Sequence, residues 1–176
     1  TLEMLHGKAA EGPFEPDTNQ PEDWYALARY WVRETYAMHG IEDAQLVKPR
    51  FRYLPLAQAN TTDKITVRFE QVIAGVPAEQ AAVNVLFDTQ GRMLSLHTTA
   101  APAVEQAGVR PLINAGFANL IAAEAFKREF GVEPTTQGNE RLVHAWIDEG
   151  ETRRWDLAWQ VEANFDSPDK PIGIRY

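Results

Sequence analysis

Hydrophobic and polar residues alternate along two stretches in the middle of the chain, 64–74 and 82–87. In the first, Ile65, Val67 and Phe69 are separated by polar or charged neighbours, and the second stretch repeats this spacing. A period of two is typical of a β-strand that turns one face to a core and the other to water. Two weaker stretches flank this pair, so we expect an antiparallel meander. Its strands are 49–56, 64–74, 82–87 and 92–97, with a turn at 88–91.

A helical spacing precedes the meander. Pro21 suits the first turn of a helix and Gly40 suits its end, and between them apolar residues fall at steps of three, four and seven. This spacing is typical of one buried face, so Arg29 and Arg33 are expected to point away from the core. Two tryptophans on one face could also stack on a sugar or a base, but the periodicity favours a core role. The stripe consists of Trp24, Leu27, Ala28, Trp31 and Met38.

A second helix, predicted at 111–131, carries two apolar stripes instead of one. A helix that is apolar on two faces is expected to be buried on both. The alanine-rich stripe would allow close approach to a sheet, and the stripe of larger residues would meet the first half of the chain. The larger residues are Ile113, Phe117, Leu120 and Ile121, and the smaller stripe is Ala115, Ala118, Ala122, Ala125 and Phe126.

The residues after this helix predict a hairpin formed by 140–148 and 154–165, followed by a further strand. Together the elements predict an α+β fold of two small units, each an α-helix packed on an antiparallel meander. The last strand is expected to be truncated at Tyr176. The expected boundaries are an irregular lead-in without a site at 1–20, a first unit at 21–98, a linker at 99–110 and a second unit at 111–176.

Composition and charge narrow the classes of function. The chain has 176 residues, with 17 basic and 25 acidic side chains and a formal net charge of −8. A nucleic acid or an acidic membrane surface would be repelled overall. The chain has no cysteine, which excludes disulfides, thiol catalysis and thiolate metal sites. No apolar run approaches the roughly 20 residues of a membrane-spanning helix.

The sequence contains no recognisable catalytic motif. It has no His-Glu-x-x-His string, no glycine-rich phosphate loop and no Gly-x-Ser-x-Gly elbow. His144 could be a site residue, but a plain strand histidine is the favoured reading, because the four histidines lack ligand spacing. The carboxylates Asp148, Glu149 and Glu151 fall in a turn, where solvent exposure is the default. We therefore expect this chain to be neither an enzyme nor the holder of a cofactor. The histidines are His6, His39, His97 and His144.

Residues 68–93 carry a family resemblance. A strand ends in Gln71, Gly75-Val76-Pro77 follow, and a second strand leads to an Asp-x-x-Gly turn. This pattern resembles the central motif of the fungalysin/thermolysin propeptide (FTP) domain, although Ala78-Glu79-Gln80-Ala81 departs from the usual residues. The second half is similar to a PepSY domain in its alanine-striped helix, its "RLVHAW" strand and "WDLAWQVEA". The order of the two matches the pro-region of secreted zinc metallopeptidases of the thermolysin and fungalysin families.

The resemblance implies a propeptide that acts as intramolecular chaperone and inhibitor of a metallopeptidase domain in cis, with cystatin-like units. It implies a secreted or periplasmic precursor with a signal peptide upstream. Zinc, with calcium as a second candidate, is expected only in the parent protease domain. The alternatives are a freestanding PepSY-type binding or inhibitory module of the cell envelope and an isolated interaction domain of a surface protein.

The resemblance also points to candidate interface residues. For each we weigh a structural role: Gln71 could bond a backbone at a bend, Gly75 and Pro77 could only form a corner, and Trp159 could be core. The candidates are Gln71, Gly75, Val76, Pro77, Trp159 and Glu162.

Overall fold

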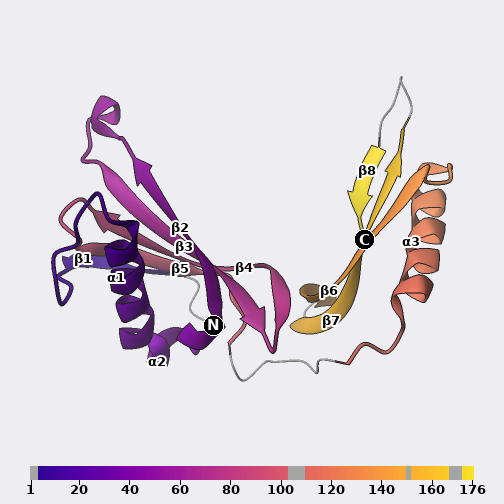
Figure 1. Cartoon of the computed structure of the whole chain (residues 1–176), viewed down its shortest axis with the longest axis horizontal. Helices are drawn as coiled ribbons and strands as arrows, with labels where there is room; N and C mark the ends of the chain where they lie inside the picture. The colour runs from indigo at the N-terminus through magenta and orange to yellow at the C-terminus, as the bar shows by residue number, and fades with distance from the viewer. Residues whose placement is uncertain (1–3, 103–109, 150–151, 167–171) are drawn as a thin grey trace. The chain divides into compact units, whose positions relative to one another are not determined.

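The computed structural model describes residues 4–102, 110–149, 152–166 and 172–176 (Figure 1). Contacts divide the chain into two compact units, Thr1–Gln106 and Ala107–Tyr176. Both contain helix and antiparallel strand pairs, which confirms a mixed α and β fold. Each unit is described by itself below.

Unit 1 is built on a five-stranded antiparallel sheet in the order β1-β5-β4-β3-β2. All four strands of the predicted meander are present. The turn between the last two also forms as expected, with Gly91 at φ 81° and its N–H donating to the carbonyl of Asp88 (3.1 Å). The strands are β1 (Met4–Ala10), β2 (Leu46–Leu54), β3 (Lys64–Ile73), β4 (Val76–Asp88) and β5 (Met93–Thr98).

The strand β1 corrects the expectation of an irregular lead-in at 1–20. It pairs antiparallel with β5, with Met4 opposite His97 and Leu5 opposite Leu96. Residues 4–10 have no alternating hydrophobic pattern, so the sequence did not indicate a strand. The strand forms because its backbone pairs with a strand nearly 90 residues away in sequence.

Helix α1 (Pro21–Glu34) lies across one face of this sheet (Figure 1). The prediction that the apolar stripe of this helix belongs to the core is confirmed for Trp24, which is fully buried. Its ring lies 6.2 Å from that of Phe51 and 5.6 Å from that of Phe87, measured between centroids. Met38 is 55% exposed, so its predicted place on the buried face is wrong. The helix is interrupted at Thr35 (φ −97°, ψ 7°) before the short α2 (Tyr36–His39), and the interruption changes the phase of the stripe.

Arg29 does not point away from the core as expected. Its guanidinium donates to the side chain and backbone of Asp43 (2.5 and 3.0 Å) and to the carbonyl of Leu46 (2.8 Å). It also lies 5.0 Å above the ring of Phe69. A long side chain can cover apolar surface while its charged end finds oxygen acceptors, so this arginine ties α1 to the start of β2. Two short 3-10 turns, η1 (Asp43–Gln45) and η2 (Ala57–Ala59), flank β2.

Among the described residues, β2 pairs only with β3 and so forms an edge of the sheet. Lys48, Arg50 and Arg52 are exposed along it. Lys48 and Arg50 also form ion pairs with Glu70 on β3 (3.3 and 2.6 Å). Charged side chains of this kind protect an edge strand from pairing with other chains.

Unit 2 consists of one helix and an antiparallel sheet in the order β6-β7-β8. The helix begins after Asn114, whose side chain accepts the backbone N–H of Phe117 (2.9 Å), and ends at Gly131 with φ 73°. The predicted hairpin is present, with Leu142 opposite Trp159. The elements are α3 (Ala115–Phe130), β6 (Thr136–Glu149), β7 (Thr152–Phe165) and β8 (Ile172–Arg175).

Candidate protein-interaction site

The candidate Gln71 is an internal residue of unit 1. Its side chain is only 1% exposed, and its amide exchanges two hydrogen bonds of 2.8 Å with the backbone of Ala101, donating to the carbonyl and accepting from the N–H. The amide also donates to the side chain of Gln45 (3.0 Å). Gln71 thus fixes the segment that follows β5 onto β3, which agrees with the backbone-bonding role weighed for it.

Gly75, Val76 and Pro77 belong to the hairpin that joins β3 to β4. The second strand begins earlier than the predicted 82–87, because Val76 pairs with Ile73 and Pro77 with Val72. Ala74 (φ 49°) and Gly75 (φ 85°) are the two turn residues, and positive φ at both is the geometry that a tight two-residue hairpin requires. The tip is exposed, with no atom within 4 Å of a Cβ built on Gly75.

Trp159 and Glu162 lie on opposite faces of β7, because side chains alternate along a strand. Trp159 is half-buried and its indole N–H donates to the carbonyl of Ile113 (2.8 Å). Glu162 accepts hydrogen bonds from Asn139 (2.8 Å) and Arg175 (3.0 Å). The bond from Asn139, followed by the charge and bond of Arg175, lowers the pKa of the Glu162 carboxyl. The structure therefore does not bring these two candidates together.

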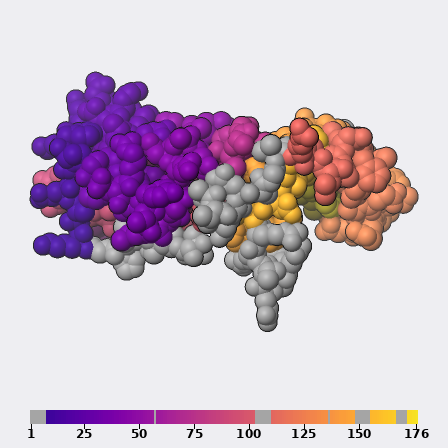
Figure 2. Space-filling model, turned by 90° about the horizontal axis from the view of Figure 1, so that it is seen from below, coloured from indigo at the N-terminus to yellow at the C-terminus, as the bar shows by residue number. Residues whose placement is uncertain are grey.

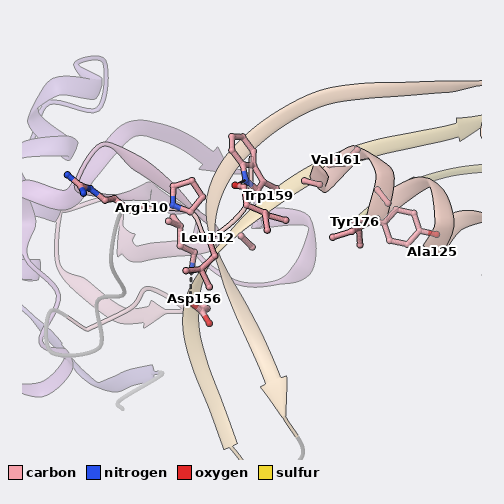
Figure 3. A pocket seen from close by; sticks show the side chains of 14 residues that line it. Arg110, Leu112, Ala125, Asp156, Trp159, Val161 and Tyr176 are labelled. Atoms are coloured by element: carbon pink, nitrogen blue, oxygen red, sulfur yellow. Dashed lines mark hydrogen bonds between the residues drawn. The ribbon is translucent and has the colours of Figure 1, made fainter. Parts of the chain in front are cut away.

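A cavity of about 640 Å³ lies between β7 and α3 beside Trp159 (Figure 3). Its walls are mostly apolar. The alanines of α3 form one wall and leave space, while the segment 110–113 and the side chains of β7 form the others. The lining residues that matter below are Ala118, Ala122, Ala125, Leu157, Trp159 and Val161.

Tyr176 borders this cavity at the end of β8. Its ring packs against the small core of Ala118, Ala122 and Val161. Its hydroxyl donates to Glu129 (3.1 Å), and partial desolvation together with this carboxylate raises the pKa of the phenol. The hydroxyl therefore stays protonated at neutral pH and acts as a donor here.

The outward face of α3 is apolar and exposed. The helix was expected to be buried on two faces. This is confirmed for the alanine-rich stripe, where Ala118 and Ala122 are buried, and it is wrong for the stripe of larger residues. Phe117, Leu120 and Ile121 are 51, 64 and 50% exposed. In Figure 2 the atoms of α3, in salmon and orange, form part of the outer surface of unit 2. We call Phe117, Leu120 and Ile121 the outer patch.

The histidines and carboxylates singled out in the sequence are the remaining candidates for a site. Within that part of the chain, no three His, Cys, Asp or Glu side chains are grouped closely enough to hold a metal ion. His144 lies on β6 and is fully buried. The side chains of Asp148 and Glu149, and the whole of Glu151, lie outside the described residues.

No described helix is both long and apolar enough to span a membrane. In comparisons with known proteins, no family model and no curated protein matches this chain. The resemblance to FTP and PepSY domains therefore rests on the residues quoted above and stays a prediction. The cavity was missed at the sequence level because its volume depends on the spacing of α3 and β7. The alanine stripe facing Trp159 was the one signal that could have indicated it.

Proposed function

We propose that this chain is the propeptide of a secreted zinc metallopeptidase of the thermolysin or fungalysin type. It acts on the protease domain as an intramolecular chaperone and inhibitor, through an FTP-like unit followed by a PepSY-like unit, each of the cystatin-like kind. The observation that carries the proposal is the apolar surface of unit 2, where the cavity and the outer patch share Ile121. Exposed apolar side chains that lie together on one face of a protein commonly mark a site that binds another protein.

The physical mechanism needs no catalytic group on this chain. A protease domain that folds through non-local contacts passes slowly through compact states with exposed apolar surface. A folded partner that covers this surface stabilises the late states and speeds folding. Tethering in one polypeptide raises the effective concentration to about millimolar, so a modest interface is enough to inhibit. Proteolytic release removes that advantage and frees the protease.

The reading frame beyond the codon of Tyr176 gives the first test. The proposal predicts a His-Glu-x-x-His motif within about a few hundred residues, because in these proteases two histidines one helical turn apart bind zinc and the glutamate between them acts as general base. A stop codon directly after Tyr176 would overturn the proposal in favour of a freestanding PepSY-type module.

A second test uses the purified chain and the mature metallopeptidase encoded with it. The chain is expected to slow peptide hydrolysis by the folded protease and to raise the activity recovered when the denatured protease is refolded. Leu120→Lys, in the outer patch, should weaken inhibition about tenfold. Gln90→Lys adds the same charge at an exposed site of unit 1 and should not. Absence of inhibition at a large molar excess of the chain would contradict the proposal.

A further inference from the structure

The sheet of unit 1 has an apolar face under α1 and a polar face on its other side. Val67 and Phe69 of β3 are fully buried on the α1 side, where Arg29 of the helix lies above the ring of Phe69. Side chains alternate along a strand, so the residues between them point to the polar face, and the register aligns residues of β2 with them. We call five side chains of the polar face the cationic face: Lys48, Arg50, Arg52, Lys64 and Arg68.

Few acidic side chains neutralise the cationic face. Glu70 lies on it and forms ion pairs with Lys48 (3.3 Å) and Arg50 (2.6 Å). Asp88 is aligned with the same face at the end of β4, but it is buried and its carboxylate accepts a hydrogen bond from Arg92 (2.6 Å). Both carboxylates are therefore already engaged within unit 1.

The other three cations of the face are bound less tightly. Arg52 is exposed and forms no ion pair with any residue that the structure describes. Arg68 is half-buried and donates a long hydrogen bond to the neutral side chain of Asn84 (3.3 Å). The ammonium of Lys64 donates to the carbonyl of Thr62 (2.9 Å). These three side chains keep donors and positive charge for an anion from outside.

Protection of an edge strand explains only part of this arrangement. Cations on β2 keep the edge of the sheet from pairing with other chains. Strand β3 is paired on both sides, with β2 and β4, so Lys64 and Arg68 have no edge to protect. Arg68 also lies directly opposite Arg50, and like charges at opposed positions destabilise a sheet. A binding role accounts for cations that the fold itself does not need.

We propose that the cationic face binds an acidic segment of another protein, extended and with carboxylates at alternate positions. Such carboxylates are about 7 Å apart, which is also the spacing of Arg50 and Arg52, two residues apart on β2. Glu70 shows how a carboxylate is held here, with one oxygen on each of two cations. A guanidinium can donate two parallel hydrogen bonds to one carboxylate, which suits Arg52 and Arg68 to the same task.

The charge of the remaining surface favours a short acidic segment over a longer polyanion. The chain has a net charge of −8 although it holds these five cations, so the surface outside the cationic face is more acidic still. A nucleic acid or an anionic membrane extends past the face and is repelled there. Two copies of the chain also repel each other overall. A short segment of a different protein meets the cations without meeting the acidic surface.

A labelled peptide tests the inference on the whole chain. The probe has ten residues with blocked ends, glutamate at alternate positions and threonine between them, and its binding is followed by fluorescence anisotropy. It is expected to bind at least about tenfold more tightly than a copy with glutamine in place of glutamate. Binding should weaken about tenfold when salt is raised from about 50 to about 500 mM. Equal binding of both peptides, or of neither, would overturn the inference.

Matched substitutions locate the site. Arg52→Gln and Arg68→Gln should each weaken binding of the glutamate peptide about threefold, and the double variant about tenfold. Arg52 is exposed, so Arg52→Gln keeps the test valid if Arg68→Gln fails to fold. Arg33→Gln removes the same charge from an exposed position on α1, on the other side of the sheet, and should leave binding within twofold. An equal effect of Arg33→Gln would show that net charge alone governs binding and would overturn the inference.

Other occupants are tested with the same variants. An oligonucleotide of ten thymidines and vesicles of phosphatidylcholine and phosphatidylserine in equal parts should bind more weakly than the glutamate peptide. Tighter binding of either one, lost in the double variant, would replace the acidic segment by that polyanion. Dimerisation in sedimentation experiments that Arg52→Gln prevents would make a second copy the occupant instead. The inference does not rest on the proposed function, which concerns the apolar surface of unit 2, so each can fail without the other.

Discussion

At the scale of single residues, the amide of Gln71 is the clearest internal tie of unit 1. Gln71→Leu keeps the volume and leaves the N–H and carbonyl of Ala101 buried without those two partners. Since each unsatisfied buried group costs roughly 1–3 kcal/mol, we expect the free energy of unfolding to fall by about 2–4 kcal/mol, measured by urea titration. Gln90→Leu, at an exposed turn, should change it by less than about 0.5 kcal/mol. Equal losses in both variants would contradict this role.

His39 makes the stability of unit 1 depend on pH. The residue is buried, its Nδ1 accepts the backbone N–H of Ile41 (3.0 Å), and its Nε2 lies 3.1 Å from the carbonyl of Val32. Burial lowers the pKa of the imidazole, and the bond to Val32 only partly opposes this. Protonation of Nδ1 would break the bond from Ile41 and place a charge in the core.

Because the pKa of His39 is lower in the folded state, its contribution to stability is complete above the unfolded value of about 6.5 and is lost as the pH falls. We expect the free energy of unfolding to fall by at most about 1.4 kcal/mol per pH unit as the pH decreases from 6.5 to the pKa of His39 in the folded protein. Urea titrations from pH 7.5 to 5 measure it. The variant His39→Gln should be less stable at pH 7.5 and lose less on acidification. An identical slope in both proteins would contradict the argument.

At the scale of elements, α3 has one buried face and one exposed apolar face. Phe126 is fully buried and lies 4.8 Å from the ring of Phe130, whereas Phe117 in the outer patch is 51% exposed. Phe126→Ala should lower the free energy of unfolding of unit 2 by about 3–5 kcal/mol. Phe117→Ala should cost less than about 1 kcal/mol and weaken inhibition instead. Thermal unfolding followed by circular dichroism measures the loss of stability in each variant. Similar losses in Phe126→Ala and Phe117→Ala would contradict the assignment of a buried and an exposed face.

The elements also show what a hydrophobic pattern can predict. The meander, the first helix and the hairpin of unit 2 were predicted because each buries one regular stripe or face, such as Ile65, Val67 and Phe69 on β3. The strand β1 and the role of Arg29 were not, because both depend on partners distant in sequence. The cavity depends on where a strand and a helix come to lie, which no local period encodes.

At the scale of the whole molecule, the two units are expected to differ in stability. Most of the buried apolar side chains in the described residues belong to unit 1, and unit 2 has the smaller core around Val161. A smaller core resists opening less. Hydrogen exchange followed by mass spectrometry should therefore find the amides of β3 and β4 at least tenfold slower than those of β6 and β7. Equal rates throughout would show that the chain opens as one cooperative body.

The exposed cations on β2 bear on how the chain behaves in concentrated solution. Lys48, Arg50 and Arg52 make the outer strand of unit 1 a poor template for a neighbouring molecule, and β1 covers the outer side of β5. The outer patch of unit 2 contains no charged residue. When a purified sample is concentrated, or salt screens the repulsion between copies, molecules are expected to associate through this exposed apolar patch and not through β2. Leu120→Lys would then improve solubility, so the same exposed side chains that are proposed to bind a partner set how concentrated the free chain can be kept.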